Sequence, residues 1–224
     1  MKRILTALIL LINIVALGTQ PPAAPTSPTA SQQTTAADGT DQGIYEFRNQ
    51  ELINIDGSKS RGFDKALESY LDENNRDSNL IFMLGNEYFR MNFYEKAFKV
   101  FSQDPTDYKN LFGAATTARL MGDYATAVQY YNRALDKNSS LGEAYLGRGM
   151  ANRGLQNFDE AISDLTNYLK FRKDENIYLG IAGIYIKTER YKEAKDILEK
   201  GRAVNPGSKN IKQMLNMVSL KIVQ

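Results

Sequence analysis

An aromatic residue followed three positions later by alanine recurs along the chain, and this recurrence constrains the fold more than any other feature. The pairs are Phe63/Ala66, Tyr94/Ala97, Tyr124/Ala127, Phe158/Ala161 and Tyr191/Ala194. Successive pairs are separated by 31, 30, 34 and 33 residues. A period in this range is typical of stacked repeat proteins, in which each unit buries its apolar faces against its neighbours.

Residues 107–140 show what one unit contains. Each half of this stretch places apolar residues at helical spacing, so that they line one face of a helix. These residues are Leu111, Ala114, Ala115 and Ala118 in the first half, and Tyr124, Ala127, Tyr131 and Ala134 in the second. Between the halves, Gly122 suits the left-handed conformation that ends a helix, and Asp123 suits the cap of the next one. The pattern predicts a helical hairpin.

The recurring hairpin resembles the tetratricopeptide repeat family, whose unit is a helix–turn–helix of about 34 residues. The resemblance rests further on Leu84, Gly85, Tyr88, Phe101, Tyr145, Gly149, Tyr178, Ala182, Tyr185 and Pro206. It implies an all-α, superhelical array of about five hairpins with a C-terminal capping helix. The expected units are 44–77, 78–106, 107–140, 141–174 and 175–207, and the cap is 208–223. Unit 78–106 is about one helical turn shorter than the others.

The chain before this array has the anatomy of an export signal and a tether. Residues 1–18 join Lys2 and Arg3 to an apolar run and a small-residue cleavage site, which predicts a signal peptide or, if retained, an N-terminal membrane anchor. Residues 19–43 hold four of the six prolines and no apolar periodicity, so we expect a disordered linker. The predicted localisation is exported: periplasmic, membrane-anchored facing the periplasm, or secreted.

Composition argues against catalysis and against nucleic-acid binding. The sequence contains no His and no Cys, which removes the commonest general base, thiolate chemistry and most zinc ligand sets. Carboxylates cluster at 159–164 and at 72–73, and we interpret both clusters as solvated helix faces and favourable charge at helix starts. Without Lys2 and Arg3 the basic and acidic residues balance at 26 each, a poor basis for contacting phosphates. We expect no enzyme activity, cofactor, metal or nucleic-acid partner.

The family resemblance implies that the first helix of each unit lines an inner surface that binds partners. The residues expected there are Phe82, Asn86, Phe89, Phe112, Thr116, Arg119, Leu146, Met150, Arg153, Leu179, Gly183 and Ile186. Their apolar side chains exceed what hairpin packing needs, although a strongly curved array would bury them. The resemblance to carboxylate-binding members is limited to Asn86. An apolar groove with two positive points would suit a peptide of apolar and acidic character.

The stretch 208–223 carries two apolar stripes. The first, Ile211, Met214, Leu215, Val218 and Ile222, has the spacing of a capping helix, with Ser208 placed at its start. The second, Met217, Leu220 and Val223, exceeds what one packing face requires. It would either tuck under the last hairpin or form a contact with a partner or a second copy. The sequence therefore predicts a non-catalytic protein-interaction scaffold of the bacterial cell envelope, with a self-associating structural element as the alternative.

Overall fold

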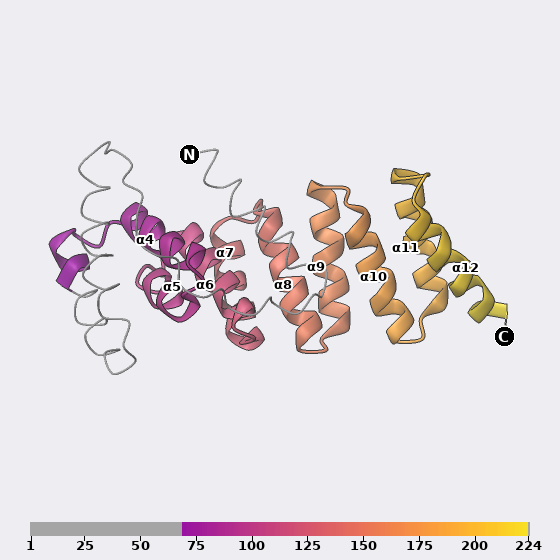
Figure 1. Cartoon of the computed structure of the whole chain (residues 1–224), viewed down its shortest axis with the longest axis horizontal. Helices are drawn as coiled ribbons and strands as arrows, with labels where there is room; N and C mark the ends of the chain where they lie inside the picture. Colours follow the sequence, from indigo (N-terminus) through magenta and orange to yellow (C-terminus); the bar gives the residue numbers. More distant parts are fainter. Residues whose placement is uncertain (1–68, 224) are drawn as a thin grey trace, which may run out of the picture. The chain divides into compact units, whose positions relative to one another are not determined.

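The computed structural model describes residues 69–223, and every regular element in this range is an α-helix (Figure 1). Residues 69–73 are helical and are followed by a turn. The later helices are α4 (Ser78–Arg90), α5 (Tyr94–Phe101), α6 (Tyr108–Leu120), α7 (Tyr124–Lys137), α8 (Gly142–Gly154), α9 (Phe158–Phe171), α10 (Glu175–Lys187), α11 (Tyr191–Val204) and α12 (Lys209–Val223). This confirms the predicted all-α fold. The predicted leader 1–18, the linker 19–43 and residues 44–68 of the first unit lie outside the described residues.

The described helices form hairpins that stack in chain order (Figure 1). In each hairpin the first helix (α4, α6, α8 or α10) packs against the second helix that follows it (α5, α7, α9 or α11). Each second helix also packs against the first helix of the next hairpin, and α11 packs against α12 in the same way. Each hairpin therefore uses its neighbours to bury its apolar faces, as the repeat pattern predicts. None of the helices within residues 69–223 is long and apolar enough to cross a bilayer.

The turn between α6 and α7 has the chemistry that the sequence predicts. Gly122 adopts a positive φ of 83°, a conformation that costs glycine little because it has no Cβ. The carboxylate of Asp123 accepts a hydrogen bond from the backbone N–H of Thr126 and so caps α7. Within residues 69–223, the alanines of the recurring pairs are completely buried, namely Ala97, Ala127, Ala161 and Ala194. The short side chains let the two helices of a hairpin approach closely.

Large aromatic rings of the second helices lie against glycines of the first helices. The ring of Phe101 lies between Gly85 of its own hairpin and Gly113 of the next. A Cβ added at either glycine would come within 2.6 Å of this ring. The ring of Tyr131 likewise lies against Gly147 of the next hairpin, where an added Cβ would lie 2.2 Å from the ring and from its hydroxyl. Since such distances do not occur between real atoms, these glycines set how closely α5 approaches α4 and α6, and how closely α7 approaches α8.

The first described hairpin has a short second helix. The α5 helix spans 8 residues, whereas α7 spans 14. The α5 helix ends at Phe101, and Asp104-Pro105 follow it. The buried Asp104 carboxylate accepts hydrogen bonds from the Thr106 hydroxyl at 2.6 Å and from the Asn110 amide at 3.1 Å. Asn110 also donates to the Ser78 carbonyl oxygen at 2.9 Å. This buried polar junction joins the start of α4 to the start of α6 and replaces the missing turns of α5.

The last described helix, α12, begins where Ser208 accepts a hydrogen bond from the Ile211 N–H at 3.1 Å, as predicted. Its packing face is Ile211, Leu215 and Val218, which are buried. Met217, Leu220 and Val223 are instead 46%, 70% and 87% exposed. The interpretation in which this second stripe tucks under the last hairpin is therefore wrong, because the buried side of the helix is already filled by the first stripe.

Candidate partner-binding surface

Each first helix has two sides covered by second helices. One side meets the second helix of its own hairpin, as Gly149 of α8 does near Ala161 and Leu165 of α9. Another side meets the preceding second helix, as Gly147 does near Tyr131 of α7. We call the remaining side the third face. It carries the side chains expected on the inner surface: Phe82, Asn86 and Phe89 on α4; Phe112, Thr116 and Arg119 on α6; Leu146, Met150 and Arg153 on α8; Leu179, Gly183 and Ile186 on α10.

The third face is largely closed at α4 and α6. Phe89, Phe112 and Thr116 are buried, and Phe82 is half-buried. The ring of Phe89 meets Tyr94 edge-on at 5.6 Å, and the ring of Phe112 lies 5.9 Å from Tyr131. The Thr116 hydroxyl lies 3.1 Å from the Tyr131 hydroxyl. These predicted contact residues therefore also pack against the second helix of their own hairpin, so packing within a hairpin accounts for part of their burial.

Two polar groups on this part of the third face are buried without a partner. Asn86 is 8% exposed, and neither its amide nitrogen nor its amide oxygen has a hydrogen-bond partner within the part of the chain that the structure describes. The Nε of Arg119 is likewise buried and unpaired there. A buried polar group without a partner costs about 1–3 kcal/mol of stability. A ligand that bonds to these groups would recover part of this cost.

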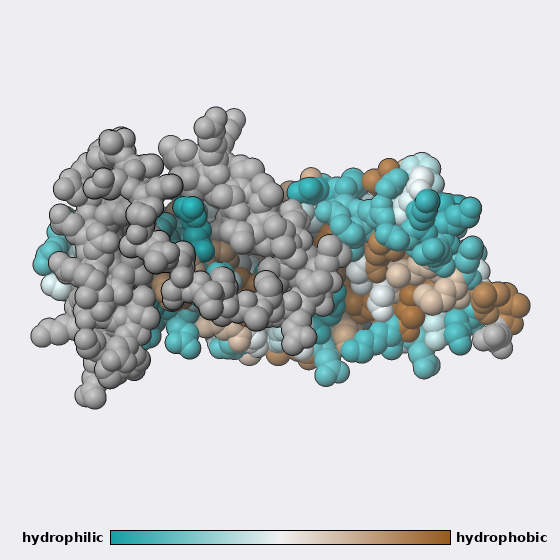
Figure 2. All heavy atoms as spheres, viewed as in Figure 1, coloured by the Kyte–Doolittle hydropathy of each residue, from teal (hydrophilic) through white to brown (hydrophobic). Residues whose placement is uncertain are grey.

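The third face opens toward the C-terminal hairpins. Leu146 is still buried, Met150, Leu179 and Ile186 are half-buried, and Arg153 is exposed. A hollow of about 400 Å³ lies between α10 and α12, lined by Leu179, Asn210, Gln213, Met214 and Met217. Figure 2 shows brown and pale spheres gathered over α10 and α12, bounded by teal. The sequence pattern predicts Leu179 on this surface, but it gives Met217 to a separate self-association contact and does not indicate Asn210 and Gln213 as lining residues.

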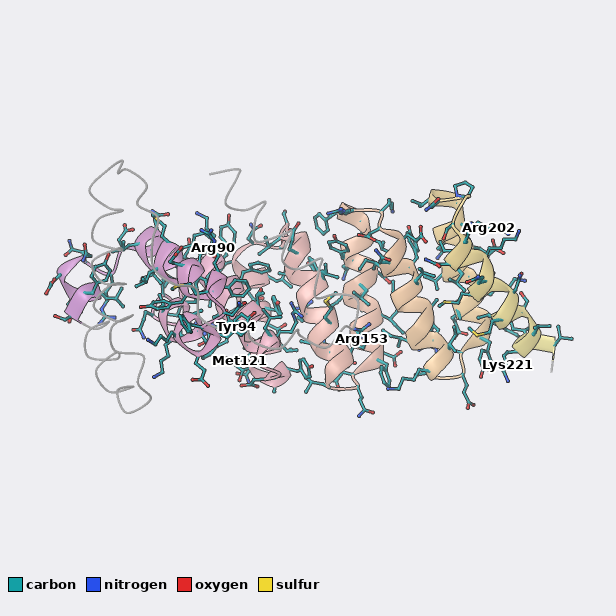
Figure 3. The ribbon with its side chains drawn as sticks, in the orientation of Figure 1. Arg90, Tyr94, Met121, Arg153, Arg202 and Lys221 are labelled. Carbon is teal, nitrogen blue, oxygen red and sulfur yellow. The ribbon has the colours of Figure 1, made fainter. Side chains whose placement is uncertain are left out.

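A basic residue stands in the last turn of each first helix. These residues are Arg90, Arg119, Arg153 and Lys187, and Lys221 has the same place in α12. Cations at this position stabilise a helix by opposing the negative end of its dipole. In Figure 3, Arg153 and Lys221 lie toward the lower edge of the array. The helices that carry the open part of the third face, α8, α10 and α12, therefore each end with a basic residue.

The carboxylates of α9 make contacts that hold the helices together. Asp159 and Glu160 lie in the first turn of the helix, as expected, and Asp159 pairs with Arg190 at 2.6 Å. Asp164 corrects the interpretation of a solvated face, because it is only 3% exposed. Arg148 donates two hydrogen bonds to its carboxylate at 2.6 and 2.9 Å, and Asn152 adds a third at 3.2 Å. These three hydrogen bonds fasten α8 to α9.

Comparisons with known proteins support tetratricopeptide repeats in this chain. Two models described as tetratricopeptide repeat match residues 109–140 and 152–217. The chain is 31% identical over 108 residues to tetratricopeptide repeat protein 12 of Mus musculus, covering 46% of this chain and 15% of that protein. It is 36% identical over 107 residues to human DnaJ homolog subfamily C member 7, covering 45% and 21%. The chain thus spans about a fifth or less of these relatives.

Solved structures with little sequence identity share the fold. MamA matches with a TM-score of 0.58 and 16% identity, covering 75% of this chain and 94% of that one. YrrB, described as a TPR protein with an unusual peptide-binding site, matches with a TM-score of 0.58 and 18% identity, covering 80% and 98%. These likenesses show that the helices are arranged as in tetratricopeptide repeat structures.

Proposed function

We propose that this protein is a non-catalytic adaptor whose third face binds a peptide segment of a partner protein. Tetratricopeptide repeat proteins mediate protein–protein interaction, and the solved structure of YrrB is described as having a peptide-binding site. The observation that carries the proposal for this chain is the unpaired amide of Asn86, with the unpaired Nε of Arg119 on the same face. An Asn amide offers a donor and an acceptor, and these match the C=O and N–H of an extended peptide.

The proposal predicts opposite effects of one substitution on stability and on binding. Asn86→Ala removes a buried amide that has no internal partner, so stability should stay unchanged or rise. Binding of a peptide that pairs with this amide should weaken by about tenfold, the equivalent of about 1.4 kcal/mol. A residue with a purely structural role would not separate the two effects in this way.

The binding test uses the full chain and random 12-residue peptides displayed on phage. Peptides that are selected are synthesised with a fluorescent label, and their Kd is measured by anisotropy for the parent protein, Asn86→Ala and Arg119→Ala. The matched control is Arg202→Ala on α11, which removes an exposed arginine that pairs with Glu199 of its own helix. Equal affinity of every variant would refute binding at Asn86 and Arg119, and failure to select any peptide would refute a peptide-binding third face.

We further propose that the array acts outside the cytoplasm, in a bacterial cell envelope. The support is the sequence of residues 1–18, with its basic start, apolar run and small residues before a proline-rich stretch. Expression in a bacterium with an intact export system should give a protein that fractionates outside the cytoplasm. Its intact mass would distinguish a cleaved leader from a retained anchor, and recovery in the cytoplasm at full mass would contradict export.

A further inference from the structure

The α12 helix repeats the third-face register of the first helices. Its buried residues Ile211, Leu215 and Val218 follow Ile177, Ile181 and Ile184 of α10 at the spacing of one repeat, and all six are buried. At the same spacing, Gln213, Met217 and Leu220 of α12 correspond to the third-face residues Leu179, Gly183 and Ile186 of α10. Ile211 also lies against Gly201 of α11, as the first helix of a following hairpin would. Met217 and Leu220 therefore extend the series of third-face residues.

The side of α12 where a second helix of its own would pack is polar. In α10 this side consists of Tyr178, Ala182 and Tyr185, of which the first two are buried. One repeat later the corresponding residues are Lys212, Asn216 and Ser219, of which the first two are exposed. A polar side of this kind suits contact with water, as in capping helices. The exposed methionine and leucine thus lie away from the side where a further helix would pack.

Open space lies beside the hollow at Gly183. This glycine lies one helical turn after Leu179 on the third face of α10, and Met217 has the corresponding position in α12. A Cβ added at Gly183 would meet no atom within 4 Å. Gly183 lies in the middle of a helix, where glycine costs up to about 1 kcal/mol relative to alanine. The hollow itself is lined by Leu179 and by Met214 and Met217, and the flexible thioethers of the two methionines adapt to apolar side chains of different shapes.

The charges of the two helices that form the hollow are mostly positive. The one acidic residue of α10 and α12 is Glu175, whose carboxylate accepts hydrogen bonds from Asn205 and Ser208. The α12 sequence contains Lys209, Lys212 and Lys221 and no acidic residue. Lys187 stands at the end of α10, where its ammonium lies 4.9 Å from the Phe158 ring centroid, and Arg153 is exposed at the end of α8. Two copies of α12 meeting face to face would bring like charges together, whereas a carboxylate on a ligand would be attracted.

We propose that α10 and α12 form an apolar subsite of the third face. It receives a partner segment with two or more apolar side chains and a neighbouring Asp or Glu. The apolar side chains occupy the hollow beside Gly183, and the carboxylate is oriented toward the lysines of α12. This inference rests on the proposed function, since it assigns the part of the same surface that selects the ligand. It makes α12 a binding element of the array as well as its cap.

Filling the hollow provides the sharpest test. Gly183→Leu places a side chain into open space and improves helix propensity, so the protein should fold with unchanged or higher thermal stability. The same leucine would occupy the space of the ligand. Met217→Ser removes an exposed apolar side chain from the lining. The matched control is Val204→Ser, at the end of α11, because Val204 is as exposed as Met217, at 44% against 46%, but does not line the hollow.

The probes are the synthetic peptides selected from the phage library, together with versions in which each acidic residue is replaced by its amide. We expect the selected sequences to combine apolar and acidic residues. We expect Gly183→Leu and Met217→Ser to weaken binding by about tenfold or more, with Val204→Ser unchanged. The amide versions should bind more weakly to the parent protein, and their affinity should depend less on salt.

Three results would overturn the subsite. Peptides that lose affinity in Asn86→Ala but bind equally to Gly183→Leu and Met217→Ser would leave the proposed function standing and refute only this inference. Selection of no peptide at all would refute both. Sedimentation that shows a dimer dissociated by Met217→Ser would assign the exposed stripe to a second copy of the chain instead.

Discussion

Acid should weaken the junction between α5 and α6 through a single carboxylate, Asp104. Burial on its own raises the pKa of Asp104, but hydrogen bonds from Ser78, Thr106 and Asn110 outweigh it and hold the pKa at about 2 instead of 3.8. The folded protein therefore favours the charged form more than the unfolded chain does. At about 1.4 kcal/mol for each pH unit, the difference is worth about 2 kcal/mol of stability.

This contribution is fully present above about pH 5, and it declines as the pH falls through 3.8 toward 2. Asp104→Asn should therefore lower the free energy of unfolding at pH 6 by about 2 kcal/mol relative to the parent protein. At pH 3 this difference in free energy of unfolding should be smaller by about 1 kcal/mol. Urea unfolding followed by circular dichroism at both pH values measures the difference. Asp136→Asn, which removes an exposed carboxylate of α7, is the control and should show no such decrease. If the difference in free energy of unfolding between Asp104→Asn and the parent is the same at pH 6 and pH 3, the ionised Asp104 carboxylate does not stabilise the fold.

Further predictions concern the packing between helices and can be checked by urea or thermal unfolding. Gly147→Ala should destabilise the protein by about 1–3 kcal/mol, because its Cβ would meet the Tyr131 ring at 2.2 Å, whereas Gly183→Ala should stabilise it by up to about 1 kcal/mol. If Gly147→Ala were more stable than Gly183→Ala, the close approach of α7 to α8 would be contradicted. Arg148→Ala should cost about 3 kcal/mol, because it leaves the buried Asp164 carboxylate without its cation; a cost below about 1 kcal/mol would show that the pair is not buried in solution. Ser208→Ala should cost about 1 kcal/mol by removing the cap of α12, and an unchanged melting temperature would argue against that cap.

The candidate surface was only partly predictable. The register of the first helices identified Leu179, Met150 and Arg153 on a third face, because residues at helical spacing share a side. The same register, continued by one repeat, would have placed Met217 there too. The sequence interpretation instead gave Met217 to a separate stripe that either tucks under the last hairpin or contacts a partner or a second copy. No sequence pattern indicated that Asn86 would be buried without a partner, since that depends on which neighbours lie around its amide.

The fold class was determined by the sequence itself. The recurring aromatic and alanine pairs specify hairpins that are unstable alone and stable when stacked, and local residues such as Gly122 and Asp123 specify the turn between two of those helices. Only the tertiary structure decided which apolar residues remain exposed. Phe112 and Met217 are both apolar and both lie on a third face, yet the first is 5% exposed and the second 46%. The physical reason is that burial is a property of the neighbours: Phe112 has Tyr131 beside it, whereas Met217 lines a hollow that no described side chain fills.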